Sequence, residues 1–157
     1  TLFRSGKKVL REVKEEDLLA DLAQVRKEAG DRAVLRALHF YADDRRAAEE
    51  ADALERKDKD AFLNLVKESG RSSWELLQNI TPAAAITHQD MAVALAVAEK
   101  ALNGKGACRV HGGGFAGTIQ AFVPVEDVCE FKKTMETMLS EGCCHVLSIR
   151  PAGGLIL

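Results

Sequence analysis

The glycine-rich segment 109–118, Arg-Val-His-Gly-Gly-Gly-Phe-Ala-Gly-Thr, constrains the fold of this chain more than any other part. Four glycines fall within six residues, between two segments that read as strands. A hairpin loop needs one or two residues with positive φ, so one or two glycines would turn the chain. Because glycine costs backbone entropy, the surplus predicts that a ligand phosphate, a sugar or another piece of protein approaches this backbone closely.

Strands and helices are predicted on both sides of these glycines. Apolar and polar residues alternate over 107–111 and 118–123, which is the period of a half-buried strand. A helix that Thr87 can cap is predicted before the first strand, and another helix after the second. Further strands near 78–80 and over 145–150 would complete the order β-α-β-β-α-β, which is that of ferredoxin-like folds.

The first eighty residues predict helices. Apolar residues recur at helical spacing from Leu18 onward, and Gly30 is placed to end the first run. Later in this half, Asp58 or Asp60 can cap a helix that Gly70 closes.

We therefore expect one α+β domain over residues 1–157. Residues 1–80 would form mainly a helical layer, and residues 81–157 would contain an antiparallel sheet with packed helices. A chain of 157 residues is long enough to bury its own core.

Composition excludes several classes of partner. The formal net charge of −2 argues against electrostatic binding to nucleic acid or to anionic lipid, and no apolar run reaches the length of a membrane span. The four cysteines form no C-x-x-C motif, so we interpret them as reduced thiols of a cytoplasmic protein. Cys143-Cys144-His145 lacks the paired spacing of a zinc site, and no metal site is expected.

The glycine-rich segment could bind an anion through its main-chain N–H groups. It is neither a P-loop, since G-x-x-x-x-G-K-[ST] is absent, nor a dinucleotide fingerprint, since a strand follows it. Arg109 and His111 lie on one face of the preceding strand and could contact a bound anion or substrate. The alternatives are a salt bridge for Arg109 and a hydrogen bond within the sheet for His111.

No catalytic constellation can be assembled from the sequence. An esterase reading of His-Gly-Gly-Gly would need a G-x-S-x-G nucleophile, which is absent. We therefore expect no catalytic residue in this chain, and if the protein is an enzyme, part of its machinery lies elsewhere.

Segment 108–118 resembles the third signature of the galactokinase branch of the GHMP kinases, which is approximately S/A-R-M-T-G-A-G-F-G-G-C. The flanking sequence is similar as well. Residues 31–39 resemble the family's arginine-rich helix, residues 68–72 its E-S-H-x-S segment, and residues 149–154 its C-terminus. The resemblance runs over nearly the whole chain but covers only the C-terminal half of that family.

The resemblance implies a fold and a function. The fold would be the ferredoxin-like C-terminal domain of GHMP kinases with added helices. The activity would be transfer of a phosphoryl group from ATP, with Mg²⁺, to the 1-hydroxyl of galactose or a related sugar, as part of galactose metabolism. The residues implied to line the sugar and nucleotide cleft are Arg109, His111, Gly112, Gly113, Gly114, Phe115, Ala116 and Gly117.

The family's sugar-binding segment, phosphate loop and catalytic aspartate and arginine belong to an N-terminal half, and no such segments occur here. We therefore expect this chain to be inactive alone and to contact ATP and sugar only together with that half. The chain starts at Thr1 and would be a piece of a longer protein. The face that meets the other half would be partly apolar and could make the fragment a homodimer.

Departures from the family pattern leave a second interpretation open. His111 stands where threonine is usual, and Ala116 stands where glycine is usual. The alternative is a stand-alone, non-catalytic regulatory or interaction domain that keeps the GHMP fold.

Overall fold

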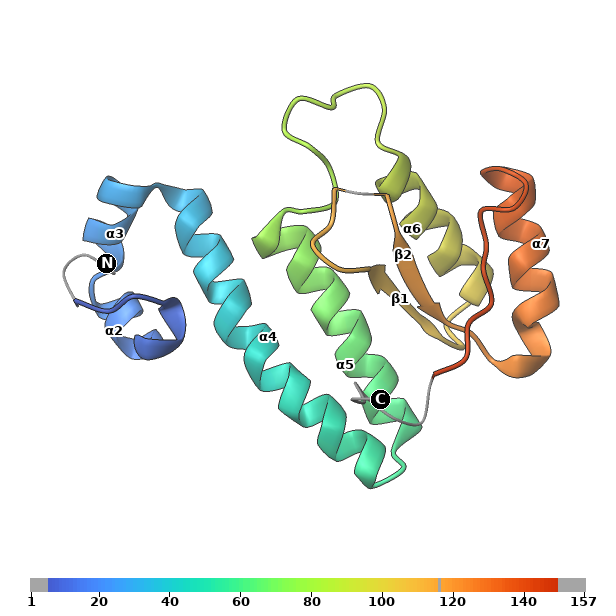
Figure 1. The fold of residues 1–157 in the computed structure, drawn as a ribbon, viewed down its shortest axis with the longest axis horizontal. Helices are drawn as coiled ribbons and strands as arrows, with labels where there is room; N and C mark the ends of the chain where they lie inside the picture. Colours follow the sequence, from blue (N-terminus) through green and yellow to red (C-terminus); the bar gives the residue numbers. More distant parts are fainter. Residues whose placement is uncertain (1–5, 116, 150–157) are drawn as a thin grey trace, which may run out of the picture.

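The computed structural model describes residues 6–115 and 117–149, which form an α+β structure built in layers (Figure 1). A two-stranded antiparallel sheet lies at the centre. Helix α5 packs on one face of the sheet and α6 on the other, while α4 packs against α5 and α7 against α6. The described elements, in chain order, are η1 (Leu10–Glu12), α2 (Glu15–Ala20), α3 (Leu22–Ala29), α4 (Asp31–Glu55), α5 (Lys59–Ser72), the π-helical turn η2 (Ser73–Leu77), α6 (Asp90–Leu102), β1 (Ala107–Val110), β2 (Ile119–Phe122), η3 (Val125–Asp127) and α7 (Val128–Met138).

The first helices form a small cluster on the N-terminal part of α4. Leu18 and Val25 are buried there against Val34 of α4. Gly30 has φ +82° and separates α3 from α4, as its position in the sequence predicts. The Tyr41 hydroxyl on α4 donates a hydrogen bond of 2.8 Å to the Val13 carbonyl, which holds this cluster to the long helix.

The sheet confirms the predicted hairpin. Ala107 pairs with Phe122, and Val110 pairs with Ile119. Cys108 and Val110 point into the main core with α6 and α7, whereas Ala107 packs against α5. The alternation of residue types along β1 therefore matches two faces that are each covered by a helix.

Two predicted strands do not form in the described part of the chain. Residues 78–80 follow a helical turn, and residues 145–149 belong to no strand. Arg150, the last residue of the second predicted strand, lies outside the described residues. A period of two reports what a segment prefers locally, but a strand also needs a neighbour to receive its backbone hydrogen bonds.

The prediction that Gly70 closes its helix is wrong, because α5 continues through Gly70 to Ser72. The reason for a glycine at this position is a close approach to β1. A Cβ on Gly70 would lie 3.0 Å from the Arg109 Cβ and 3.2 Å from the Cys108 carbonyl oxygen. The missing side chain thus lets helix and strand backbones come together.

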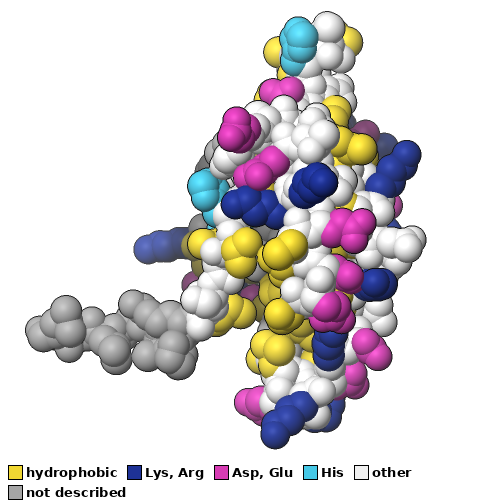
Figure 2. Space-filling view, turned by 90° about the vertical axis from the view of Figure 1, so that its right-hand side faces the viewer, with side chains coloured by type: hydrophobic (Ala, Val, Ile, Leu, Met, Phe, Trp, Pro, Cys, Tyr) yellow, Lys and Arg dark blue, Asp and Glu magenta, His cyan; other side chains and the backbone are white. Residues whose placement is uncertain are grey.

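Large hydrophobic side chains remain exposed on the side of the molecule formed by α7 and the segment after it. Figure 2 looks onto this side and shows hydrophobic side chains gathered along its middle. The exposed large hydrophobic residues of η3, α7 and the following segment are Val125, Met138, Val146, Leu147 and Ile149. Among the described helices, none has the length and low charge that crossing a membrane requires.

The N-cap of α5 provides a first test of the fold. The Asp58 side chain accepts a 3.0 Å hydrogen bond from the Ala61 backbone N–H. We expect Asp58→Ala to lower the free energy of unfolding by about 1 kcal/mol, because this N–H loses its partner. Urea unfolding measures the change. Asp60→Ala in the same first turn is the control and should cost less, and equal losses in both variants would contradict the cap assignment.

Candidate functional site

The glycine loop connects β1 to β2 and has an unusual backbone. The His111 N–H donates to the Thr118 carbonyl at 3.1 Å and closes the loop at its base. Within the loop, positive φ angles occur at Gly112 (+64°), Gly114 (+75°), Phe115 (+55°) and Gly117 (+85°). Ala116, which was predicted to line the cleft, lies outside the described residues.

The four glycines fall into two kinds. A Cβ added to Gly112, Gly113 or Gly117 would meet no atom within 4 Å, so their backbones border open space. A Cβ added to Gly114 would lie 2.2 Å from the Asn79 carbonyl oxygen and 2.6 Å from its Nδ2. At Gly114, another piece of the protein is what approaches the backbone, as one of the three sequence-based interpretations predicts.

Asn79 holds the loop on both sides of Gly114. Its carbonyl oxygen accepts a 2.9 Å hydrogen bond from the Phe115 N–H. Its side-chain Nδ2 donates to the Gly113 carbonyl at 3.3 Å. The loop is thus anchored at its centre, while Phe115 keeps 45% of its surface exposed.

The end of α5 and the turn η2 place Asn79 at the loop. Gln78 adopts a left-handed conformation, and its N–H bonds to the Ser73 carbonyl at 2.8 Å, which ends the helical segment. Two arginines of α4 reach the last carbonyls of this segment over long contacts: Arg32 to Gln78 at 3.5 Å and Arg36 to Leu77 at 3.4 Å. These cations suit the negative end of a helix.

Arg109 is engaged with α5. Its Nη1 donates to Ser69 Oγ at 2.5 Å, and its Nε donates to the Val110 carbonyl at 3.1 Å. Burial raises the pKa of Glu50 on α4, and the positive charge of Arg109 opposes this shift. The side chain therefore links β1 to the helical layer by hydrogen bonds, and not by the salt bridge that was the alternative predicted for this residue.

Ser69 belongs to a buried polar cluster between α4 and α5. Ser69 Oγ donates to Asp43 Oδ1 at 2.5 Å, and Asp43 Oδ1 also accepts from Arg46 Nη1 at 2.6 Å. His39 Nδ1 lies 2.9 Å from Ser72 Oγ, and His39 Nε2 lies 3.7 Å from Asp43 Oδ2. Serine, histidine and aspartate are thus neighbours, but both serines and His39 are buried, and the cluster offers no route for a substrate.

His111 is exposed at the end of β1. Its Nδ1 lies 3.3 Å from the Gln120 side-chain oxygen on β2, which makes it a hydrogen-bonded residue of the hairpin. Cys108 on β1 is buried, and burial raises the pKa of its thiol to about 11. A thiol with that pKa stays protonated at neutral pH and is a poor nucleophile.

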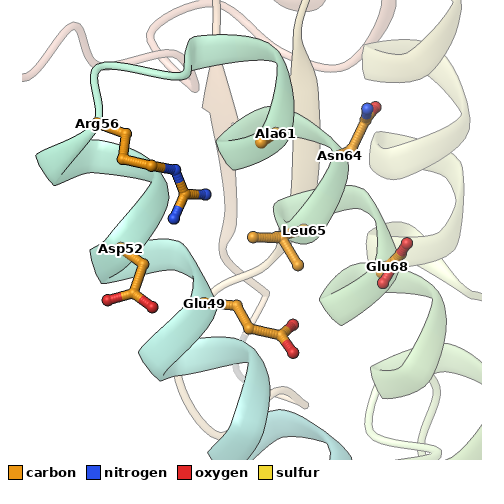
Figure 3. Close-up of a pocket in the computed structure, with 7 residues that line it drawn as sticks. All are labelled: Glu49, Asp52, Arg56, Ala61, Asn64, Leu65 and Glu68. Atoms are coloured by element: carbon orange, nitrogen blue, oxygen red, sulfur yellow. The ribbon is translucent and has the colours of Figure 1, made fainter.

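A groove beside the helices of the N-terminal half does not suit an anionic ligand. It lies between α4 and α5, has a volume of about 350 Å³, and carries three carboxylates against one guanidinium (Figure 3). In the described part of the chain, no three histidine, cysteine or acidic side chains gather into a group that could hold a metal ion. The residues that line the groove are Glu49, Asp52, Arg56, Ala61, Asn64, Leu65 and Glu68.

Sequence patterns did not find Asn79 as part of the site. It lies 35 positions from Gly114 in the chain and was assigned to a strand. Only the length of η2 and the left-handed Gln78 bring it to the loop. A polar residue in an apolar stretch was the one available signal.

Comparison with known proteins found no family model and no curated protein that matches this chain. The candidate site therefore rests on the geometry of the loop and on the residues that resemble galactokinases.

Because His39 is buried, we expect acid to destabilise the protein. Burial lowers the pKa of His39, and Arg46 and Arg109 lower it further, against the opposing charge of Asp43. The folded state therefore disfavours the proton. The stabilisation is complete above the unfolded pKa of about 6.5 and is lost as pH falls through the folded pKa, by at most about 1.4 kcal/mol per pH unit.

Urea unfolding between pH 7.5 and pH 5 measures this loss. His39→Gln, which does not titrate, should flatten the dependence. His88→Gln, at an exposed position before α6, is the control and should keep the wild-type slope. Identical slopes for His39→Gln and wild type would refute the assignment.

Alanine substitutions should lower the free energy of unfolding strongly at Gly114 and little at Gly113. Gly114→Ala should cost about 2 kcal/mol or more, because the Cβ meets the Asn79 backbone and φ is positive. Gly113→Ala should change the free energy of unfolding by less than about 0.5 kcal/mol, since the position is open. Thermal unfolding of both variants checks the pair, and comparable destabilisation by the two would show that the loop is not held at Gly114.

Proposed function

We propose that this chain is the C-terminal part of a galactokinase-like sugar kinase, in which ATP phosphorylates the 1-hydroxyl of galactose or a related sugar. The observation that carries the proposal is the open backbone at Gly112, Gly113 and Gly117. Packing within the chain explains Gly114, and positive φ angles favour glycine at Gly112 and Gly117, so Gly113 is the glycine that neither reason explains. Backbone that no side chain covers is suited to close contact with a ligand, and loop 112–117 would form one wall of the cleft.

The contribution of this wall would be positioning. Phosphoryl transfer depends largely on holding donor and acceptor in line and on stabilising charge, so a firm backbone surface is useful without carrying a reactive group. Gly114 and Asn79 make the loop firm, and the other glycines leave it accessible. Contact of His111, Phe115 or Ala116 with a substrate stays a prediction, and so does contact of Arg109, whose guanidinium would have to leave Ser69.

The ferredoxin-like architecture is part of the same proposal. Helix α6 precedes β1, and α7 follows β2, which is the α-β-β-α centre of the predicted order. Segments 78–80 and 145–149 would be the outer strands of that order and would need sheet neighbours to form.

The nucleotide and its metal would be held chiefly by the other half of the enzyme. Mg²⁺ prefers carboxylate and phosphate oxygens, and the described residues bring no three acidic, histidine or cysteine side chains together. The chain alone would therefore not turn over substrate. The exposed hydrophobic side chains of α7 and residues 145–149 would meet the other half or, in the fragment, a second copy. Such a kinase would work in the cytoplasm on galactose metabolism.

Gly113→Val is the sharpest test of the loop assignment. A Cβ on Gly113 would meet no atom within 4 Å, and the φ of Gly113 lies outside the left-handed region, so the variant should fold. In the full-length protein we expect ATP-dependent phosphorylation of galactose by wild type. We expect a loss of kcat/KM of at least about tenfold in the variant, because the valine fills space that the ligand needs.

The control is Ala48→Val, at an exposed position on α4, which should keep wild-type kinetics. Unchanged kinetics in a folded Gly113→Val protein would remove the loop from the cleft. Titration calorimetry of the wild-type protein with galactose and with ATP tests the whole proposal. Absence of binding and of turnover would leave the alternative, a non-catalytic regulatory or interaction domain.

A further inference from the structure

Asn79 is a polar residue with only 2% of its surface exposed. Its polar groups bracket Gly114: the carbonyl oxygen accepts from the Phe115 N–H at 2.9 Å, and Nδ2 donates to the Gly113 carbonyl at 3.3 Å. The residues before and after Gly114 are thus fastened to one residue from another layer of the fold. Neither contact was needed to turn the chain, because the base of the loop is already closed by His111 and Thr118.

The fit between Asn79 and Gly114 is steric as well as polar. A Cβ on Gly114 would collide with the Asn79 carbonyl oxygen, Nδ2 and Cγ, at 2.2, 2.6 and 2.7 Å. Leucine at position 79 would keep the volume and lose the donor. Aspartate would keep the shape and set a carboxylate oxygen against the Gly113 carbonyl.

The remaining polar atom of the side chain, Oδ1, is buried and has no hydrogen-bond partner among the described residues. An unpaired buried acceptor is unfavourable, so an amide here is a poor choice for stability alone. What the amide adds over an apolar side chain is the Nδ2 bond to the loop.

We propose that Asn79 is the positioning residue of the glycine loop, which sets the conformation of residues 113–115 before any ligand binds. Asn79 touches no substrate and acts through the loop backbone. Its role in binding rests on the proposed function, whereas its hold on the loop does not. A loop that is ordered in advance spares the ligand the entropy of ordering it, so the consequence is tighter binding at the open glycines.

Hydrogen exchange of the ligand-free protein tests the hold on the loop. Asn79→Asp and Asn79→Ala both remove the Nδ2 bond to the Gly113 carbonyl, while the Phe115 N–H keeps its bond to the Asn79 backbone. The loosened loop should open more often, so exchange of the Phe115 amide should speed up by roughly tenfold, the factor that one lost hydrogen bond gives, with α6 and β1 unchanged. The matched controls are Asn64→Asp and Asn64→Ala at an exposed position on α5, which should exchange as wild type.

Steady-state kinetics of the full-length protein test the role in binding. A loosened loop should raise KM for sugar or ATP by roughly 3- to 10-fold with a smaller change in kcat, because the ordering cost falls on the binding step. A merely structural role would reduce the fraction of folded enzyme and hence the apparent kcat, at unchanged KM.

Each outcome decides the matter. Wild-type exchange at the Phe115 amide in folded Asn79 variants overturns the proposal, and faster exchange with unchanged KM overturns the role of Asn79 in binding. If both Asn79 variants fail to fold, the residue belongs to the core of the domain and the proposal is overturned as well. If exchange speeds up but the wild-type protein phosphorylates no sugar, the hold on the loop is established and the proposed function is what fails.

Discussion

The close contact of α5 with β1 at Gly70 is the constraint on which the rest of the structure depends. With no side chain at Gly70, the helix lies against the Arg109 Cβ and the Cys108 carbonyl oxygen. The segments after α5 and β1 therefore meet: α5 continues through η2 to Asn79, and β1 continues to the glycine loop that Asn79 contacts. The close seating of α5 on the strand, together with η2 and Gln78, brings Asn79 within reach of Gly114.

A cluster of polar side chains beside this contact fixes how α5 lies on β1. Arg109 of β1 bonds to Ser69 of α5, and Ser69 bonds to Asp43 of α4. Three layers are thus joined by a chain of hydrogen bonds inside a mostly apolar packing. Buried polar groups stabilise little in net terms, but they are costly to leave unpaired, so they disfavour any other register between helix and strand.

The cluster also shows why residue types alone can mislead. Ser72, His39 and Asp43 are of the residue types found in a hydrolytic triad, and His39 lies within reach of each of the other two. Because Ser72 and His39 are buried, these groups form a structural link instead of a reactive site. Conversely, the loop has no reactive group, and its open backbone is what makes it the candidate site.

The sequence by itself determined the local structure: the break at Gly30, a helix start that Asp58 or Asp60 can cap, the alternation along β1 and the excess of glycine between two strands. Each of these depends on a residue and its near neighbours. Tertiary structure alone decided which segments pair and what each glycine is for. Among the described residues, 145–149 have a strand pattern but pair with no strand. Asn79 fills the space that a side chain on Gly114 would need, while Gly113 is open. The physical reason is that pairing and close packing depend on residues distant in the chain, and local periodicity carries no record of them.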